Sequence, residues 1–139
     1  MTQQEFDALK QRVAANDPNA MFAYAELMRA TDSAEYEKYL TLAAQLGQPQ
    51  AAERVGDMLI ERGDYENAAH NFKTGAKAGL MDCAAKLAAI KLSVNEPVAL
   101  RELEELAESG VQSACIALAS YHKSKGNRKE AAFWRSLVN

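Results

Sequence analysis

The chain contains little of what disulfide frameworks and flexible linkers are made from. Its 139 residues include two cysteines, three prolines and seven glycines, and only 7% of the residues are aromatic. Two cysteines, Cys83 and Cys115, are too few for a disulfide scaffold, and buried thiols in a reducing compartment are favoured over a disulfide. The low proline and glycine content also leaves little room for long disordered segments.

Long hydrophobic runs are missing as well, which bears on membranes and secretion. The N-terminus, MTQQEFDALKQRVAANDP, has neither a basic opening nor an apolar run of signal-peptide length. Elsewhere no stretch approaches the ~18 uninterrupted apolar residues of a transmembrane helix. We therefore expect a cytoplasmic protein that makes no membrane contact.

An excess of positive charge is absent too. The formal net charge of −3 argues against a general nucleic-acid binder. One basic segment, residues 121–135, holds six of the basic or histidine side chains against Glu130 alone. It is short and has few interleaved aromatic residues, so a cation-rich, solubilising chain end is favoured over a nucleic-acid site.

Motifs that carry catalysis or hold cofactors do not occur. The sequence contains no H-E-x-x-H, C-x-x-C or G-x-S-x-G pattern and no glycine-rich phosphate loop. His70 and His122 lie far apart in the sequence, with no cysteine or carboxylate at metal-ligand spacing. The sequence thus predicts a protein that is not an enzyme, with no cofactor and no metal, and His70 is most simply an exposed helix residue.

What the chain does have is a helix-ending residue, here called a stop, at regular intervals. Asn16, Gly47, Gly79 and Gly110 follow one another at spacings of 31, 32 and 31 residues. Asparagine and glycine are the residues that readily adopt the left-handed backbone conformation that ends a helix. A fixed period of this size is typical of an array of stacked repeats.

Apolar spacing between the stops predicts an all-α protein with nine helices and no strand. Asp17, Asp32 and Asp64 are the expected N-caps, Ser93 with Glu96 opens a later helix, and Gly126–Asn127 repeats the capping pattern. The expected helices cover residues 2–15, 19–30, 33–46, 50–61, 65–78, 81–92, 97–109, 111–123 and 128–138.

Aligning the repeats on their stops reveals columns of alternating size. The residues four and nine positions after a stop are small, and the residue eight positions after it is larger. Such alternation lets helices approach closely within and between hairpins. The three columns are Ala20, Ala51, Cys83 and Ala114; Tyr24, Val55, Leu87 and Leu118; and Ala25, Gly56, Ala88 and Ala119.

This pattern resembles the Sel-one-like repeats, which are relatives of the tetratricopeptide repeats. Their consensus is roughly A-x-x-x-L-G-x-x-Y, a turn, then A-x-x-W-[FY]-x-x-A-A-x-x-G. The best match is Ala51, Val55, Gly56 and Leu59 followed by Ala68, Phe72, Ala76 and Gly79, and residues 131–134 resemble the start of a last, truncated second helix. The repeats here lack the usual longer turn insertion, so their length is nearer the tetratricopeptide value of ~34 residues.

The resemblance implies a right-handed α-solenoid of antiparallel helix hairpins that serves as a protein-interaction scaffold. One domain, 1–139, would comprise an N-terminal helix, 1–16, and four repeats, 17–47, 48–79, 80–110 and 111–139. Simple arrays of this type are common in bacteria. The paired cysteines of the secreted branch are missing, which agrees with a cytoplasmic location.

In such arrays the first helix of each pair lines a concave face, which would bind a peptide or a folded protein. Three carboxylates at intervals of four, Glu53, Asp57 and Glu61, share one helical face and with Glu26 and Asp82 would favour a basic segment. The alternative is that these are ordinary solvated faces. Transferred by position, the groove residues are Asn19, Phe22, Glu26, Arg29, Gln50, Glu53, Asp57, Glu61, Asp82, Ser113, Ser120 and Lys123.

A second hypothesis is self-assembly. No repeat follows the final helix in this sequence, so residues 133–138 would be left uncovered, and a homodimer formed through that end would bury them. Trp134 is expected to pack on the preceding helix, although it could instead anchor an interface. An enzyme remains a third and less favoured reading.

Overall fold

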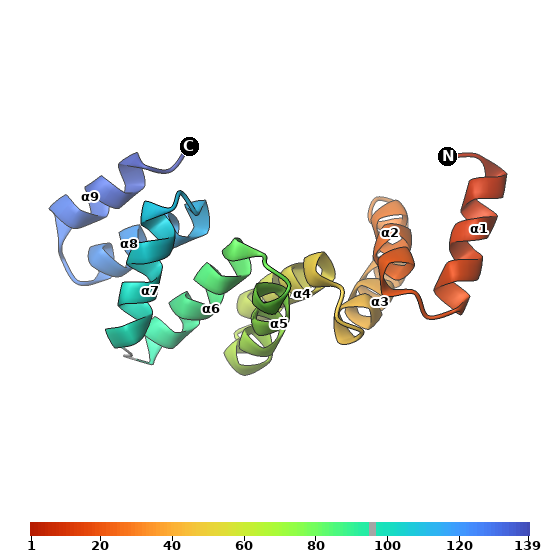
Figure 1. The fold of residues 1–139 in the computed structure, drawn as a ribbon, viewed down its shortest axis with the longest axis horizontal. Coiled ribbons are helices and arrows are strands. Elements are labelled where there is room, and N and C mark those ends of the chain that lie inside the picture. Colours follow the sequence, from red (N-terminus) through yellow and green to blue (C-terminus); the bar gives the residue numbers. More distant parts are fainter. Residues whose placement is uncertain (95–96) are drawn as a thin grey trace. The chain divides into compact units, whose positions relative to one another are not determined.

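The structure is a computed structural model that describes residues 1–94 and 97–139. These residues form nine α-helices and no strand, in the chain order that Figure 1 labels. The helices are α1 (Gln3–Ala14), α2 (Pro18–Met28), α3 (Ser33–Gln45), α4 (Pro49–Glu61), α5 (Tyr65–Lys77), α6 (Met81–Ser93), α7 (Pro97–Glu108), α8 (Gln112–Ser124) and α9 (Arg128–Ser136).

The predicted all-α repeat fold is confirmed, with every helix end within two residues of its expected position. The four stops also behave as expected, because Asn16, Gly47, Gly79 and Gly110 all have positive φ, from 62° to 94°. At Gly47 the backbone N–H groups of Gly47 and Gln48 close the end of α3 by donating to the carbonyls of Ala44 and Ala43. The expected start at Ser93 and Glu96 involves residue 96, which lies outside the described residues.

The chain divides into two compact units, Met1–Ala78 (unit 1) and Gly79–Asn139 (unit 2). The grouping of all repeats into one domain stays a prediction. Across the described residues, no helix combines the length and the apolar character needed to cross a membrane.

Unit 1 is held together by helix pairs that follow one another along the chain. Helix α2 packs on α3 and α4 packs on α5, while α3 contacts α4 and α1 contacts α2. Three rings, Phe6, Tyr24 and Tyr39, link α1, α2 and α3, with centroids 6.2 Å and 4.9 Å apart. Between them and α4 lies a core of buried residues, Met21, Ala25, Leu40, Ala43, Ala44, Ala51 and Ala52.

The close contact between α4 and α5 depends on Gly56. A Cβ atom built on Gly56 would lie 2.5 Å from Cε1 of Phe72, whose side chain is fully buried. The ring thus occupies the space that any larger residue at position 56 would need. The predicted small column has a direct steric reason here.

Unit 2 has a core of alanines, one cysteine, two leucines and one large ring. Helices α6, α7, α8 and α9 pack in succession, and α6 also contacts α8. Trp134 is buried in this core, so the expected packing of the last helix on its predecessor is confirmed. Within the described residues its indole N–H has no hydrogen-bond partner. The other buried members are Ala85, Ala88, Leu103, Ala107, Ala114, Cys115, Leu118 and Ala119.

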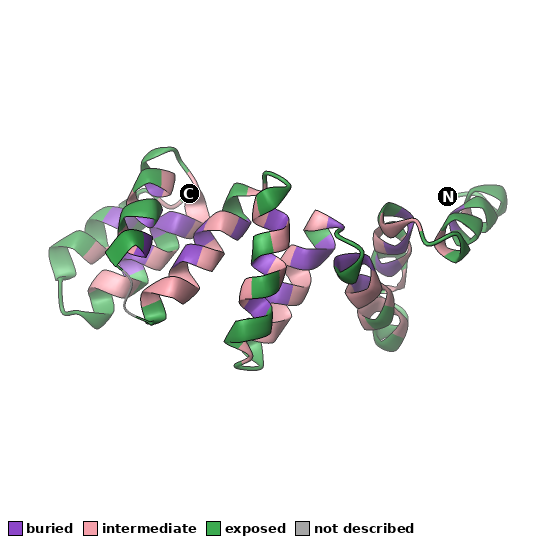
Figure 2. Cartoon of the chain, turned by 60° about the horizontal axis from the view of Figure 1, so that its bottom comes forward, coloured by how far each residue is buried: buried purple, intermediate pink, exposed green. Residues whose placement is uncertain are grey.

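The two columns of small residues are buried throughout, as the repeat register predicts. Ala20, Ala51, Cys83 and Ala114 are all 0% exposed, and the column of Ala25, Gly56, Ala88 and Ala119 is buried as well. Figure 2 shows buried residues, in purple, on the sides of α4 and α5 that face each other. Each unit therefore forms its core from the same two register positions.

One predicted cap is confirmed in position but not in its hydrogen bond. Asn127 is the N-cap residue of α9, but its side chain makes no capping hydrogen bond in the described structure. Its amide nitrogen instead lies 3.5 Å from Nδ1 of His122. By contrast, the Asp17, Asp32 and Asp64 side chains each accept a hydrogen bond from the first turn of the following helix, as predicted.

Candidate functional site

The twelve predicted groove residues fall into two sets, one in each unit. In unit 1 they lie on α2 and α4, with Arg29 as the C-cap residue of α2, and in unit 2 they lie on α6 and α8. All twelve are exposed or half-buried and so remain accessible at the surface of their units. The unit 1 set is Asn19, Phe22, Glu26, Arg29, Gln50, Glu53, Asp57 and Glu61, and the unit 2 set is Asp82, Ser113, Ser120 and Lys123.

Glu26 has a partner that the charge pattern did not reveal. Arg54 of α4 forms a bidentate ion pair with its carboxylate, in which Arg54 Nη2 lies 3.0 Å from Glu26 Oε2. The same guanidinium lies 5.1 Å from the centre of the Phe22 ring. Two predicted groove residues on α2 are thus joined to α4 through one arginine, and the charge of Glu26 is balanced locally.

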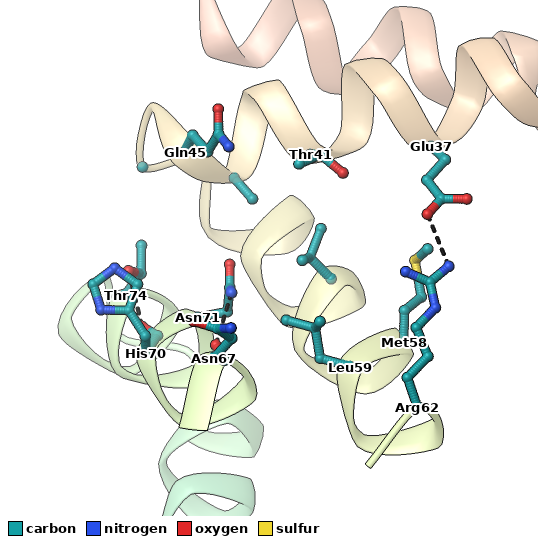
Figure 3. A pocket seen from close by; sticks show the side chains of 13 residues that line it. Glu37, Thr41, Gln45, Met58, Leu59, Arg62, Asn67, His70, Asn71 and Thr74 are labelled. Atoms are coloured by element: carbon teal, nitrogen blue, oxygen red, sulfur yellow. Dashed lines mark hydrogen bonds and ion pairs between the residues drawn. The ribbon is translucent and has the colours of Figure 1, made fainter. Parts of the chain in front are cut away.

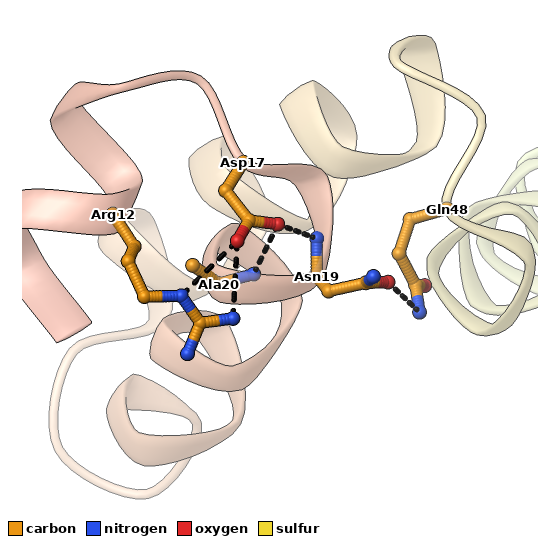
Figure 4. A network of polar contacts seen from close by, with 5 residues as sticks. All are labelled: Arg12, Asp17, Asn19, Ala20 and Gln48. Atoms are coloured by element: carbon orange, nitrogen blue, oxygen red, sulfur yellow. Dashed lines mark hydrogen bonds and ion pairs between the residues drawn. The ribbon is translucent and has the colours of Figure 1, made fainter.

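A polar network surrounds the start of α2 (Figure 4). The Asp17 carboxylate accepts from the backbone N–H groups of Asn19 and Ala20, at 3.0 Å and 3.3 Å, and pairs with Arg12 of α1. The hydrogen bond from the Ala20 N–H, followed by that from Arg12, lowers the pKa of Asp17 below its ordinary value of 3.8. Asp17 both caps α2 and ties it to α1.

Gln48 links the starts of α2 and α4. It is the only polar residue that is buried in the described part of the chain. Its Oε1 accepts from the Ala51 N–H at 2.7 Å and caps α4, while its Nε2 donates to Gln50 Oε1 at 2.6 Å and to Asn19 Oδ1 at 3.4 Å. Figure 4 shows the bond between Asn19 and Gln48. The side chains of the predicted groove residues Asn19 and Gln50 therefore hydrogen-bond to Gln48 and help to hold the starts of α2 and α4 together.

Unit 2 has a comparable link between the starts of its first helices, α6 and α8. Ser113 of α8 donates a hydrogen bond from its hydroxyl to the carboxylate of Asp82 on α6. Next to it, Gln112 Nε2 donates to the carbonyl of Leu137, and the backbone N–H of Asn139 donates to Gln112 Oε1 at 2.7 Å. The chain end is thereby fastened to the start of α8.

Two grooves lie along first helices, one in each unit. The α1/α2 groove of unit 1 has a volume of about 660 Å³ and is mostly apolar, with Phe22, Ala23, Glu26 and Leu27 along α2. The α6/α8 groove of unit 2 has a volume of about 590 Å³. Its lining residues are Ala89, Leu92, Ser93, Ala117, Ser120, Tyr121, Ser124 and Lys125. Of the predicted residues, Phe22, Glu26 and Ser120 line these grooves.

A third groove, which sequence reasoning missed, lies between the second helices of unit 1. Its volume is about 550 Å³; α3 and α5 form its walls and α4 its floor, as Figure 3 shows. None of the twelve predicted residues lines it. The signal that could have found it is the run of amide, hydroxyl and imidazole side chains at Asn67, His70, Asn71 and Thr74, which recur every three or four residues on one face of α5.

No group of three or more histidine, cysteine, aspartate or glutamate side chains in residues 1–94 and 97–139 could hold a metal ion. At the far end of unit 2, Phe133 is 52% and Leu137 42% exposed, so α9 presents part of an apolar face to solvent.

Comparison with known proteins found no family model, no curated protein and no solved structure that matches the chain. What the structure itself establishes is an all-helical repeat protein with preformed grooves on both units.

Proposed function

We propose that the chain is a protein-interaction module of the Sel-one-like, tetratricopeptide-related type, which binds a peptide or a protein segment along its first helices. The observation that carries this proposal is that the same register positions line a groove in both units. Positions 7, 10 and 11 after the stop are Ala23, Glu26 and Leu27 in α2, and Ala117, Ser120 and Tyr121 in α8.

These positions differ from those of the two fully buried columns, although Ala117 also packs against the core of unit 2. The buried columns lie four and nine residues after each stop, whereas positions 7, 10 and 11 face the grooves. A small residue at position 7, Ala23 or Ala117, keeps the groove open beside larger neighbours. All six side chains are exposed or half-buried, so their recurrence supports a surface used for binding.

The two grooves differ in chemistry and would suit different parts of a partner. The α1/α2 groove favours apolar side chains, because Ala8, Leu9, Phe22 and Leu27 line it. The neighbouring helix α4 carries Glu53, Asp57 and Glu61, which supports a partner with a basic segment beside its apolar residues. The α6/α8 groove has alanines in its lining, with hydroxyl groups and Lys125 around them.

The proposal is tested by closing the grooves. We would select binders to the full chain from a random peptide library and measure their affinities for an Ala23→Arg, Ala117→Arg double variant. A long side chain at position 7 fills each groove, so binding should weaken at least ten-fold. The matched control, Ala34→Arg with Ala132→Arg, places the same charge on exposed alanines of α3 and α9.

Charge reversal tests the nature of the partner. If the ligand has a basic segment, Glu53→Lys with Asp57→Lys should weaken binding several-fold, and more at low than at high salt. Equal affinity in the groove-closing variant and its control would overturn the proposed surface. Unchanged affinity after charge reversal alone would leave the surface in place and remove the basic segment.

Self-assembly is the alternative function, and the exposed face of α9 is the observation that favours it. Dimerisation would cover Phe133 and Leu137, which are 52% and 42% exposed. Light scattering over a range of concentrations should then show a dimer that Phe133→Ser with Leu137→Ser converts to a monomer. We further propose a cytoplasmic location, since Cys83 and Cys115 are buried and form no disulfide.

A further inference from the structure

We propose that the groove between α3 and α5 of unit 1 is a second, separate binding site that takes a short, extended, uncharged segment of a partner protein. This second-helix groove is defined by the residues Glu37, Thr41, Ala44, Gln45, Gly47, Val55, Met58, Leu59, Arg62, Asn67, His70, Asn71 and Thr74. Its walls come from second helices, and of the register positions on which the proposed function rests only position 11, Met58 of α4, contributes to its floor.

Both walls of the groove carry side chains that can donate and accept hydrogen bonds. Thr41 and Gln45 come from α3, and His70, Asn71 and Thr74 come from α5 (Figure 3). Such groups match the alternating N–H and C=O groups of an extended main chain, which need partners when they leave water.

Part of this hydrogen-bonding capacity is unused within the described structure. The side chains of Gln45 and His70 make no hydrogen bond there. Asn71 uses its Nδ2 to donate to the carbonyl of Asn67 at 2.9 Å, and its Oδ1 therefore remains an acceptor. Thr74 donates to the carbonyl of His70 at 3.3 Å and keeps its lone pairs.

The floor of the groove is apolar and belongs to α4. Val55, Met58 and Leu59 are each half-buried there, and Ala44 of α3 closes the side. A methionine in such a floor adapts to different shapes. Beneath two hydrogen-bonding walls, this floor suits one aliphatic side chain of the bound segment.

The charge of the lining selects a neutral occupant. Glu37 is the only carboxylate and Arg62 the only guanidinium or ammonium group among its residues, and they neutralise each other through an ion pair of 2.8 Å between Oε1 and Nη2. With no unbalanced cation, a nucleic acid is disfavoured. With no Tyr, Trp or Phe ring, a stacking platform for a sugar is also lacking.

Hydrogen bonding further selects an extended segment over a helix. A helical partner satisfies its own backbone groups and would leave the amides of the groove walls buried and unpaired, at a cost. The α3 wall runs from position 37 to 45, about 12 Å at 1.5 Å per residue. At about 3.3 Å per extended residue, that length accommodates three or four residues of the partner.

The experiment uses NMR on the ¹⁵N-labelled full chain. The probe is a pool of acetylated and amidated heptapeptides, made of serine, threonine and glutamine with a central valine, leucine or methionine. We expect millimolar binding, because so short a contact buries little area, with shifts confined to the amides of α3 and α5 and the floor of α4. N-methylation at alternate peptide residues removes main-chain donors and should abolish the shifts.

Variants assign the effect to the groove walls. Gln45→Ala with His70→Ala removes two side chains without intramolecular hydrogen bonds, so the fold should persist while the affinity falls about ten-fold. Gln4→Ala with Lys73→Ala, at exposed positions outside the lining, serves as the matched control.

Several outcomes would overturn the second-helix groove as a peptide site. These are the absence of shifts with every pool, equal affinity in the wall variant and its control, or equal shifts with the N-methylated peptides. Shifts caused instead by maltohexaose would assign the groove to carbohydrate. The Ala23→Arg, Ala117→Arg variant should bind the pool normally, so a failure here is distinguishable from a failure of the proposed function.

Discussion

Units 1 and 2 share a repeat register but start their helices in different ways. In unit 1, each of α1 to α5 begins at a residue whose side chain accepts a hydrogen bond from the first turn. In unit 2, α6, α8 and α9 have no such side-chain bond within the described residues, and α7 begins directly after residues 95–96.

The register shows what replaces the missing caps. The residue after each stop is Asp17 or Gln48 in unit 1, but Leu80 or Val111 in unit 2. Val111 packs against the core cluster of unit 2. One position can therefore stabilise a helix start either by a hydrogen bond or by apolar burial. The two units thus differ at this position: α2 and α4 begin with a side-chain hydrogen bond, and α8 begins with a residue packed on the core.

The largest expected effect comes from removing the ring at the centre of unit 2. Trp134→Ala deletes the largest side chain of the unit 2 core and should cost about 3–5 kcal/mol. Native-state hydrogen exchange should show lost protection in α6 to α9 and little change in α1 to α5. Phe133→Ala, at the exposed neighbour, is the control and should cost less than about 1 kcal/mol. Equal loss in both units would mean that they unfold as one.

The next largest effect concerns the register position nine residues after a stop, where α4 of unit 1 requires glycine and α6 of unit 2 favours alanine. Gly56→Ala in unit 1 places a Cβ against the Phe72 ring and should destabilise the protein by about 1–3 kcal/mol, although alanine favours a helix. The equivalent Ala88→Gly in unit 2 should cost about 1 kcal/mol for the reverse reason, helix propensity and lost burial. Urea unfolding measures both. A stabilised Gly56→Ala variant would show that the ring can move aside.

Caps test the comparison directly. Asp64→Ala removes the side chain that accepts from the Asn67 N–H at 3.2 Å and should cost about 1 kcal/mol. Asn127→Ala, at the equivalent N-cap position of α9, removes no capping bond and should cost only a few tenths of that. Thermal unfolding of the two variants gives the values. Similar losses would contradict the difference drawn between the units.

The smallest effect is a pH dependence at the start of α2. Since folding lowers the pKa of Asp17, its ionised form stabilises the folded state fully above its ordinary value of 3.8, and this contribution is lost as the pH falls through the lower folded value. Asp17→Asn should therefore flatten the loss of stability below about pH 4. Urea unfolding from pH 2 to pH 7 tests this, with Asp7→Asn on exposed α1 as the control.

The fold was largely predictable because its signals are local. The stops at Asn16, Gly47, Gly79 and Gly110 act within a few residues, and the caps at Asp17, Asp32 and Asp64 do so as well. The capping bond predicted for Asn127 is missing because its side-chain amide lies beside the ring of His122 instead. The helix start at Gln48–Pro49 was predicted, but the capping bond of the Gln48 side chain was not, because glutamine is not a usual cap residue and this side chain is buried and bonded to Asn19 of another repeat.

The grooves were only partly predictable because they form between helices. Register alone pointed to Phe22, Glu26 and Ser120, which do line grooves. It could not show that Arg54, 28 residues further on, would balance Glu26. The polar run on α5 marks one wall of the second-helix groove, but the groove itself depends on the spacing of three helices, which that pattern does not specify. The division into two units was not predicted either, because the repeat period is the same in both units.

The positions of the two cysteines allow the opening of one unit to be measured separately from that of the other. Both cysteines of the chain lie in unit 2, Cys83 at 0% and Cys115 at 1% exposure, and unit 1 has none. A thiol reagent can reach them only after their surroundings open, so the rate of alkylation records the opening of unit 2 alone. The unmodified protein thus needs no added label to report how often unit 2 opens.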